Sequence, residues 1–397
     1  MTRRLLTDAT WCWWTKPRAI QLGETLYLAA IDSQGNVFAA TLDAQTGDAR
    51  RSVLATHEPD DHNNPALVVV PGRTALAFYS RHDADNFVRY RESTAHADVL
   101  DWGPEKVIEF PGVTSYAQVH AVGNYLTLFT RCGVTSWHFS RSADWGNSWT
   151  EPQPFISLDT DQLVYMPTTM LADGRTVRVA ITGHPKEYDL KPIHNIWTCV
   201  FDLQTGEVSR PSTGDVVANL FHGSGLPLHE TDLELAFECP PDRTINLFDV
   251  GDGPDFEIGF ASKNIGDRAT TDGRYEVCAM HNGRWASETV SPSGGIFGYI
   301  HAGMYVGGVS FPDQTTGGRI YVSREEGGLW HVEEWSRRPD GSWLGVPLEQ
   351  PGSTRIVRPW AMAGHGVGPS LLALELERYD NNYMNVVSHV VEVGGRG

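Results

Sequence analysis

A short apolar strand of similar composition returns along the whole chain, at steps of about 50 residues that lengthen twice after residue 175. A period of this length, with several short strands in each unit, is typical of β-propeller blades. Because the strand returns seven times, we expect an all-β chain folded as a seven-bladed β-propeller. The repeated strands are LYLAAID (26–32), TALAFYSRH (74–82), NYLTLFTRC (124–132), RTVRVAITGH (175–184), RTINLFDVGD (243–252), GRIYVSREE (318–326) and PSLLALELER (369–378).

A second strand type follows several of these repeats and ends in a turn with a tryptophan. The segment SADWGNSW (Ser142–Trp149) fits the Asp-box pattern S-x-D-x-G-x-S/T-W, and HNGRW (281–285) and PDGSW (339–343) are degenerate copies. In such a turn the aspartate binds turn amides, the glycine supplies a positive φ, and the tryptophan packs between strands. We therefore interpret these boxes as structural turns at the outer edge of blades.

The domain organisation follows from the absence of any low-complexity segment or Pro/Ser-rich linker in the 397 residues. Abundant glycine (40) and proline (23) suit many short strands joined by turns. We predict one domain over residues 1–397, in which the segment around Leu5–Trp14 closes the ring with strands at 384–394.

The formal net charge of −18 argues against a nucleic-acid-binding protein, which needs a basic surface. An anionic substrate would have to be attracted by a local cluster of Arg, Lys and His. No run of 18 apolar residues is present, so no membrane association is predicted, and the N-terminal segment has no apolar signal region. The expected location is cytoplasmic, or secreted if a leader has been removed.

Five single cysteines without a CxxC pair predict buried free thiols rather than a disulfide scaffold. The alternative is a structural metal that uses one cysteine with histidine neighbours. They are Cys12, Cys132, Cys199, Cys239 and Cys278.

The ends of the repeated strands are the first candidates for a functional site, because equivalent ends in successive blades lie around one axial rim. They carry Asp32, Arg81–His82, Arg131–Cys132, Gly183–His184, Asp249 and Arg378. A lone histidine is more often structural, but two at equivalent positions beside arginines make a functional and a structural role equally good interpretations.

The segment DDHNNPAL (60–67) is the second candidate. An Asx-type turn accounts for its Asp, Asn and Pro residues but gives no reason for His62. Because His62 and His82 flank one hairpin-like unit, we expect them to approach one another. Similar entry positions in other blades carry Tyr165, His301, Tyr305 and Arg358.

Four blocks of the sequence resemble, in order, those of the BNR-4 type propeller family. They are WCWWTKPRAI, DDHNNPALVVVPGRTALAFYSRH, VYMPTTMLADGRTVRVAITGHP and MYVGGVSF…IYVS…W…VRPW, and they span residues 11–365. The family includes seven-bladed ulvan lyases and enzymes that remove the rhamnose capping glucuronate on arabinogalactan. The resemblance implies a central site in which histidines and a tyrosine perform acid–base chemistry and an arginine neutralises a uronate carboxylate.

By this resemblance His62 and His82 match the family's paired histidines, Tyr165 matches its tyrosine, and His184 lies in its GHP block. Val164 stands where the family usually has proline. Arg81, Arg131 and Arg358 are all candidates for the carboxylate-binding arginine, so the subfamily is left open. Asn63, His301 and Tyr305 are the further expected substrate contacts.

The predicted function is a lyase that cleaves a rhamnose–uronate linkage in an acidic oligosaccharide or polysaccharide by β-elimination. The reaction needs a neutralised carboxylate, a base and an acid, which Arg, His and Tyr supply. His62 or His82 is the predicted base and Tyr165 the acid or base partner, with Asn63 or Asn64 supporting the enediolate-like charge. No cofactor or catalytic metal is expected; a structural Zn²⁺ or Ca²⁺ is the alternative.

Two other functions are open from the sequence. A glycoside hydrolase that releases rhamnose from glucuronate would use two carboxyl groups. A non-catalytic carbohydrate-binding propeller would keep aromatic platforms and tolerate loss of His62 and His82, since a fold does not by itself fix a function.

Overall fold

The computed structural model describes residues 2–43, 46–96, 98–184, 195–265, 272–295, 306–312, 318–349, 355–362, 370–379 and 383–394, without the side chain of His184. The chain divides into two compact units. The first unit comprises residues 1–133, 139–152 and 362–397, and the second comprises residues 134–138 and 153–361. Among the described residues, no helix has the length and apolar character needed to cross a bilayer.

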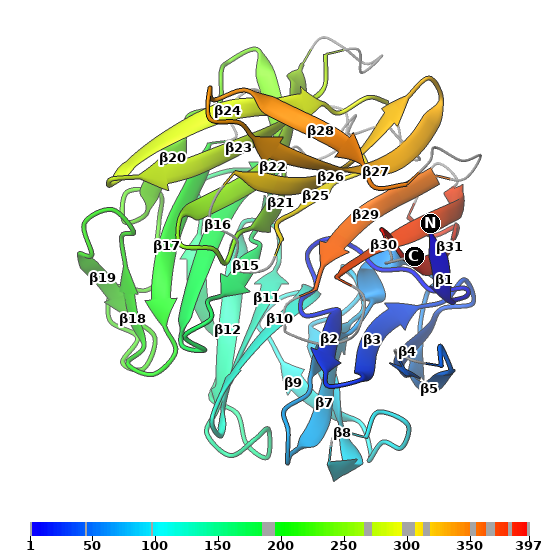
Figure 1. Ribbon diagram of the computed structural model, residues 1–397. Helices are drawn as coiled ribbons and strands as arrows, with labels where there is room; N and C mark the ends of the chain where they lie inside the picture. The colour runs from blue at the N-terminus through cyan, green and yellow to red at the C-terminus, as the bar shows by residue number, and fades with distance from the viewer. Residues whose placement is uncertain are drawn as a thin grey trace. The chain divides into compact units, whose positions relative to one another are not determined.

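The described residues of the first unit form antiparallel strands and one short 3-10 helix, η1 (Asp61–Asn63) (Figure 1). Its strands are β1 (Arg3–Leu6), β2 (Ala19–Leu22), β3 (Thr25–Ile31), β4 (Asn36–Asp43), β5 (Ala49–Thr56), β6 (Ala66–Val68), β7 (Thr74–Ser80), β8 (Phe87–His96), β9 (Lys106–Glu109), β10 (Thr114–Val122), β11 (Tyr125–Cys132), most of β12 (Ser136–Ser142), β30 (Leu371–Tyr379) and β31 (Val386–Glu392).

The second unit is also built of antiparallel strands. They are β13 (Gln153–Ser157), β14 (Leu163–Tyr165), β15 (Thr168–Met170), β16 (Thr176–His184), β17 (Ile196–Asp202), β18 (Glu207–Ser209), β19 (Val216–Asn219), β20 (Glu234–Phe237), β21 (Arg243–Val250), β22 (Phe256–Asn264), β23 (Arg274–His281), β24 (Arg284–Pro292), β25 (Val309–Ser310), β26 (Arg319–Glu326), β27 (Leu329–Arg337), β28 (Trp343–Pro347) and β29 (Arg355–Ala361).

The seven repeated segments all form strands, which are β3, β7, β11, β16, β21, β26 and β30. The prediction of seven blades, in contrast, is corrected to six. Among the described residues six sheets have the four strands in simple order that a blade requires, and the remaining sheet differs from them because it has seven strands in a branched order. The branching arises because β14 and β15 both pair with β16, while β17 pairs with β16, β18 and β20. The spacing of apolar segments along the sequence predicts where strands form, but it does not predict which strands pair with one another.

The predicted closure between the chain ends is confirmed within the first unit. β1 pairs antiparallel with β31, with Arg3 opposite Glu392. The backbone of Ala9 continues the contact by donating to the Ser388 carbonyl at 2.8 Å. This pairing covers an edge of β31 that would otherwise be open.

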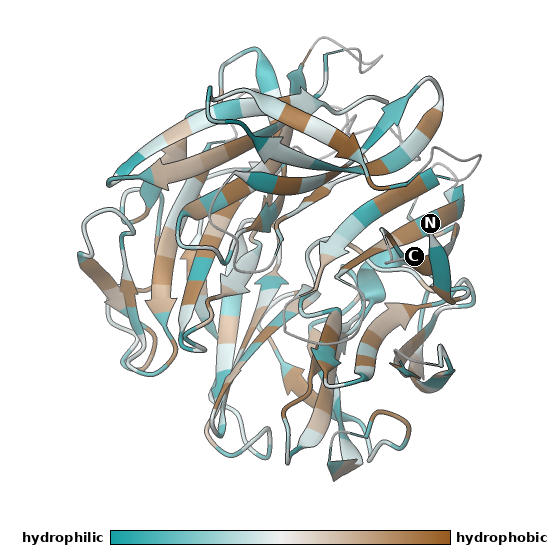
Figure 2. Ribbon diagram, viewed as in Figure 1, coloured by the Kyte–Doolittle hydropathy of each residue, from teal (hydrophilic) through white to brown (hydrophobic). Residues whose placement is uncertain are grey.

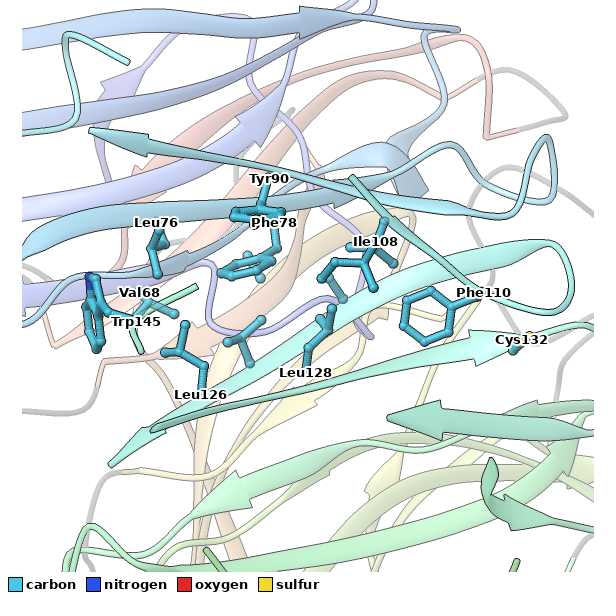
Figure 3. Packing of buried hydrophobic residues seen from close by; sticks show 14 residues of the cluster. Val68, Leu76, Phe78, Tyr90, Ile108, Phe110, Leu126, Leu128, Cys132 and Trp145 are labelled. Atoms are coloured by element: carbon cyan, nitrogen blue, oxygen red, sulfur yellow. The ribbon is translucent and has the colours of Figure 1, made fainter. Parts of the chain in front are cut away.

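The cores lie between successive sheets, and Figure 2 shows the alternation of hydrophobic and hydrophilic residues along many of the strands that this packing requires. In the first unit one cluster joins the sheet of β6–β9 to β10 and β11, with Phe78, Leu128 and Trp145 among its members (Figure 3). A second cluster joins the sheet of β2–β5 to β6 and β7. In the second unit a comparable cluster joins β16, β17 and β20 to β21–β23.

The Asp-box at Ser142–Trp149 forms the expected turn. Asp144 accepts hydrogen bonds from the Ser148 backbone at 2.9 Å and from the Ser142 hydroxyl at 2.8 Å. Gly146 has φ +84°, and the ring nitrogen of Trp145 donates to the Thr74 carbonyl at 3.2 Å. All five cysteines are buried and none forms a disulfide, as predicted.

Glu257 on β22 is a buried carboxyl in the second unit, and its burial makes the stability of the fold depend on pH. Burial raises its pKa from 4.5 to about 7, while a hydrogen bond of 3.1 Å from the Gly318 backbone opposes the shift. A carboxyl whose folded pKa is raised destabilises the protein as pH rises from its unfolded pKa through its folded pKa.

We expect Glu257→Gln to increase the free energy of unfolding at pH 8 by about 1–3 kcal/mol and to change it little near pH 4.5, because glutamine keeps the acceptor without a buried charge. Urea unfolding at both pH values measures this. Glu334→Gln is the control, since Glu334 pairs with Arg319 at the surface at 2.6 Å; its effect should stay below about 1 kcal/mol. An equal gain at both pH values would contradict the prediction.

Candidate active site

The segment 60–65 places His62 because its residue types favour a short capped turn. Asp60 is the N-cap of η1, and its Oδ1 accepts the His62 backbone N–H at 2.9 Å. Asn64 returns to extended backbone ahead of Pro65, which limits the turn. The His62 side chain is 3 % exposed and therefore lies inside the protein.

His82 follows β7 and meets His62, as the sequence predicted. The two imidazole rings stack with centroids 4.2 Å apart and an interplanar angle of 12°. Asp60 bridges them, with Oδ1 at 2.6 Å from Nδ1 of His62 and Oδ2 at 2.9 Å from Nδ1 of His82. One carboxylate thus orients both rings and leaves both Nε2 atoms turned away from it.

The environment pushes the pKa values of the two histidines apart. Burial acts to lower the pKa of His62, but the Asp60 and Asp61 carboxylates outweigh it and raise this pKa well above 6.5. Burial and the charge on His62 lower the pKa of His82, and the hydrogen bond to Asp60 offsets only part of this. Burial also acts to raise the pKa of Asp60, yet the histidines hold it below its ordinary value. These opposite shifts favour a protonated His62 beside a neutral His82.

Asn63 and Asn64 support this arrangement through the backbone. Oδ1 of Asn63 accepts the His82 N–H at 2.7 Å, and its Nδ2 donates to the Glu58 carbonyl at 3.1 Å. Oδ1 of Asn64 accepts the Cys12 N–H at 3.0 Å. Asn63 thus helps to hold the backbone of His82, and its role as a substrate contact stays a prediction.

Arg131, at the end of β11, is the candidate arginine that lies beside the histidines. Its side chain is fully buried, and its Nη2 donates to Asp83 Oδ1 and Oδ2 at 2.9 and 3.0 Å. Asp83 Oδ2 lies 3.5 Å from Nε2 of His82. Arg81, in contrast, pairs with Glu58 and Asp85 and is 34 % exposed.

Tyr116 on β10 is a site residue that sequence reasoning missed. Its ring centroid lies 5.7 Å from that of His62 and 5.8 Å from that of His82, and the Arg131 guanidinium lies 5.0 Å from it. Its φ is +64°, and the ladder of β10 with β11 shifts register between Ser115 and Gln118. A β-bulge redirects a side chain, and positive φ in a bulky residue is strained, so such positions cluster at functional sites. No residue type in the segment TSYAQV (114–119) predicts this bulge.

Two further aromatic rings enclose the histidines. Trp14 stacks on His62 with centroids 6.1 Å apart, which gives part of the WCWW segment a place at the site. Tyr383 meets the edges of both rings, at 4.8 Å from His62 and 5.4 Å from His82. Tyr383 was also missed, because only tertiary structure brings the β30–β31 connection to residue 62.

The other predicted site residues belong to the second unit. Tyr165 lies on β14 and is buried, and Arg358 lies on β29 with φ +53° and is also buried. His184 ends β16, opposite Leu163. His301 and Tyr305 lie outside the described residues.

Within the part of the chain that the structure describes, two groups of side chains have spacings that a metal ion would accept. Asp60, His62 and His82 place one ligand atom each within 4.8 Å of one another, as do Glu326, His331 and Glu333 in the second unit. In the first group both Nδ1 atoms already bond Asp60. In the second, Arg324 already pairs with Glu326 at 3.1 Å and with Glu333 at 2.7 Å. A structural metal therefore stays a prediction from the sequence.

We expect Asp60→Asn to lower the pKa of His62 by roughly one unit or more, because the variant loses a carboxylate that favours the imidazolium. Following both imidazoles by NMR across pH 4–9 measures this. Asp85→Asn, which removes a carboxylate that pairs with Arg89 at 2.7 Å, is the matched control and should leave both histidines unchanged. Unaltered titration of His62 in Asp60→Asn would show that Asp60 does not set its charge.

No family model and no curated protein matches this sequence. Among solved structures, an ulvan lyase of polysaccharide lyase family PL25, bound to -[GlcA(1-4)Rha3S]-, has a TM-score of 0.76 at 14 % identity, over 100 % of this chain and 97 % of that chain. A second structure of a PL25 ulvan lyase gives the same TM-score, identity and coverage. A prolyl endopeptidase gives a TM-score of 0.50 at 11 % identity, over 94 % of this chain and 46 % of that chain. This likeness shows that the chain has an all-β, β-propeller fold.

Proposed function

We propose that this protein is a polysaccharide lyase that cleaves uronate-containing saccharides by β-elimination. The observation that carries the proposal is the stacked histidine pair on one carboxylate, with its two pKa values driven apart. Paired titratable groups whose environments separate their pKa values are typical of acid–base catalysis. The fold shared with an ulvan lyase whose ligand contains GlcA and Rha supports the substrate class, and a rhamnose–uronate linkage is the finer proposal.

His82 is the proposed base. It is neutral near pH 7, its Nδ1 is fixed by Asp60, and its side chain is 10 % exposed, whereas that of His62 is 3 % exposed. In the reaction Nε2 takes the C5 proton of the uronate. The electrons of the C5–H bond form the C4=C5 double bond as the C4–O bond breaks, and an acid protonates the departing oxygen.

Arg131 is the proposed carboxylate clamp. A guanidinium that binds both oxygens of the substrate carboxylate withdraws charge and makes the C5 proton more acidic. Of the three arginines considered from the sequence, Arg131 lies in the histidine cluster, and Arg81 is bound in a surface ion pair. The clamp stabilises the enediolate-like charge more than the ground state, which is the requirement for catalysis.

A tyrosine is the proposed acid that protonates the leaving oxygen. Tyr116 is favoured by its strained backbone and its place against both histidines and Arg131. Tyr165 is the candidate that the family resemblance implies. His184, His301, Tyr305 and Arg358 stay proposed substrate contacts.

The hydrolase alternative is less well supported by the described carboxylates at this site. A glycosidase needs one carboxyl that stays protonated to act as acid. Burial favours that form in Asp60 and Asp83, but the histidines and Arg131 hold the pKa of each below its ordinary value. These groups are therefore suited to orientation and charge pairing.

We expect His82→Ala to reduce the formation of unsaturated uronate from ulvan and from rhamnose–glucuronate oligosaccharides by about 10²–10⁴-fold. Ultraviolet absorbance of the products measures this. Because the pKa of His82 is lowered, kcat/KM in the wild type should rise with pH and pass half of its plateau value below pH 6.5. His120→Ala, which removes a histidine on β10 outside the pair, is the control. Release of free rhamnose without an ultraviolet signal would mean hydrolysis, and no product would favour a binding module.

Tyr116→Phe and Tyr165→Phe separate the two candidate acids. We expect Tyr116→Phe to lower kcat by about 10²-fold or more, because it loses a proton donor and keeps the ring packing. Tyr165→Phe should then change kcat much less. Steady-state kinetics with both variants, alongside their melting temperatures, gives the answer. The reverse ranking would assign the acid to Tyr165.

A further inference from the structure

Asp83 covers the arginine that the proposed reaction needs. The Asp83 side chain is 44 % exposed, whereas Arg131 beneath it is 0 % exposed. A substrate approaching from solvent therefore meets Asp83 before it meets the guanidinium. Arg131 lies in turn over the ring of Tyr116, which is also fully buried.

The contacts of Asp83 are those that a substrate carboxylate would make. Both of its oxygens accept hydrogen bonds from Nη2 of Arg131, at 2.9 and 3.0 Å. The Ser115 hydroxyl donates to Oδ1 at 2.9 Å. Oδ2 lies 3.5 Å from Nε2 of His82, the nitrogen that serves as the proposed base. A carboxylate thus already stands between the proposed clamp and the proposed base.

The backbone conformation at residue 83 places the Asp83 side chain against Arg131. Its φ is +50°, a left-handed conformation in the tight turn after β7, and its N–H donates to the Ser115 hydroxyl at 3.1 Å. Asp and Asn tolerate this conformation better than most residues. The turn therefore accepts the change from Asp to Asn with little strain.

We propose that Asp83 is a built-in carboxylate that occupies the substrate-carboxylate subsite, and that a uronate binds by displacing it from Arg131. The inference rests on the proposed function, because it takes Arg131 as the clamp. An exchange of one carboxylate for another keeps the buried guanidinium paired at all times, which avoids the cost of an isolated buried charge. A neutral sugar offers nothing to replace Asp83, so the exchange selects for anionic substrates.

The test is a calorimetric titration of the whole protein with D-glucuronate, and with D-glucose as the uncharged probe, at pH 7 and low salt. We expect Asp83→Asn to bind glucuronate about tenfold more tightly than the wild type, because the competing carboxylate is gone. Binding of glucose should not change. Asp85→Asn is the matched control, since Asp85 lies in the same connection but pairs with Arg81 and Arg89.

A second variant covers the case in which Asp83→Asn fails to fold. Asp83→Gly also removes the competing carboxylate and suits the φ of +50° at residue 83, so glucuronate should again bind more tightly than it does to the wild type. Equal or weaker glucuronate binding in the folded variants would overturn the displacement model. If these variants still convert saccharide to unsaturated product, the lyase function stands without the displacement. If glucuronate binds to none of the proteins and no product forms, both proposals fail.

Discussion

The buried carboxylate of Asp60 is the group on which the histidine site depends. It caps η1, and it binds Nδ1 of both His62 and His82. Two stacked imidazoles would repel one another if both were charged. A single shared carboxylate neutralises one imidazolium and leaves the other ring neutral. Acid–base asymmetry thus follows from the shared Asp60 carboxylate, the Asp61 carboxylate 2.9 Å from His62 Nδ1, and two rings at 4.2 Å.

The groups around the two histidines also meet the requirement that a buried charge has a partner of opposite charge. Arg131 cannot stay inside the first unit without an anion, and Asp83 supplies one from the neighbouring connection. The bulge at Tyr116 brings an aromatic face to the guanidinium. Each of these features costs backbone strain, since Asp83 and Tyr116 both have positive φ. The surrounding sheets, with their packed clusters, hold the strained turns in place.

Much of the fold could be predicted because the side-chain pattern of a strand is local. Every repeated segment became a strand, and β1 closed on β31 as expected. The blade count could not be predicted in the same way. The segment that forms β14–β20 contains the expected repeated strand, β16, yet its strands pair in a branched order. Which strands pair depends on segments that lie far apart in the sequence and can occupy the same strand edge, and the spacing of strands along the chain contains no information about that choice.

For the site, the sequence by itself determined the meeting of His62 and His82, because a hairpin of fixed length joins them. It also determined the capped turn at Asp60, through the residue types of DDHNNP. Tertiary structure alone decided that Asp60 would bridge the two rings and that Arg131 would be the arginine beside them. It also decided that Tyr116 and Tyr383 would join the site. The reason is that a bulge and a contact across more than 300 residues depend on how whole sheets pack, which no short segment specifies.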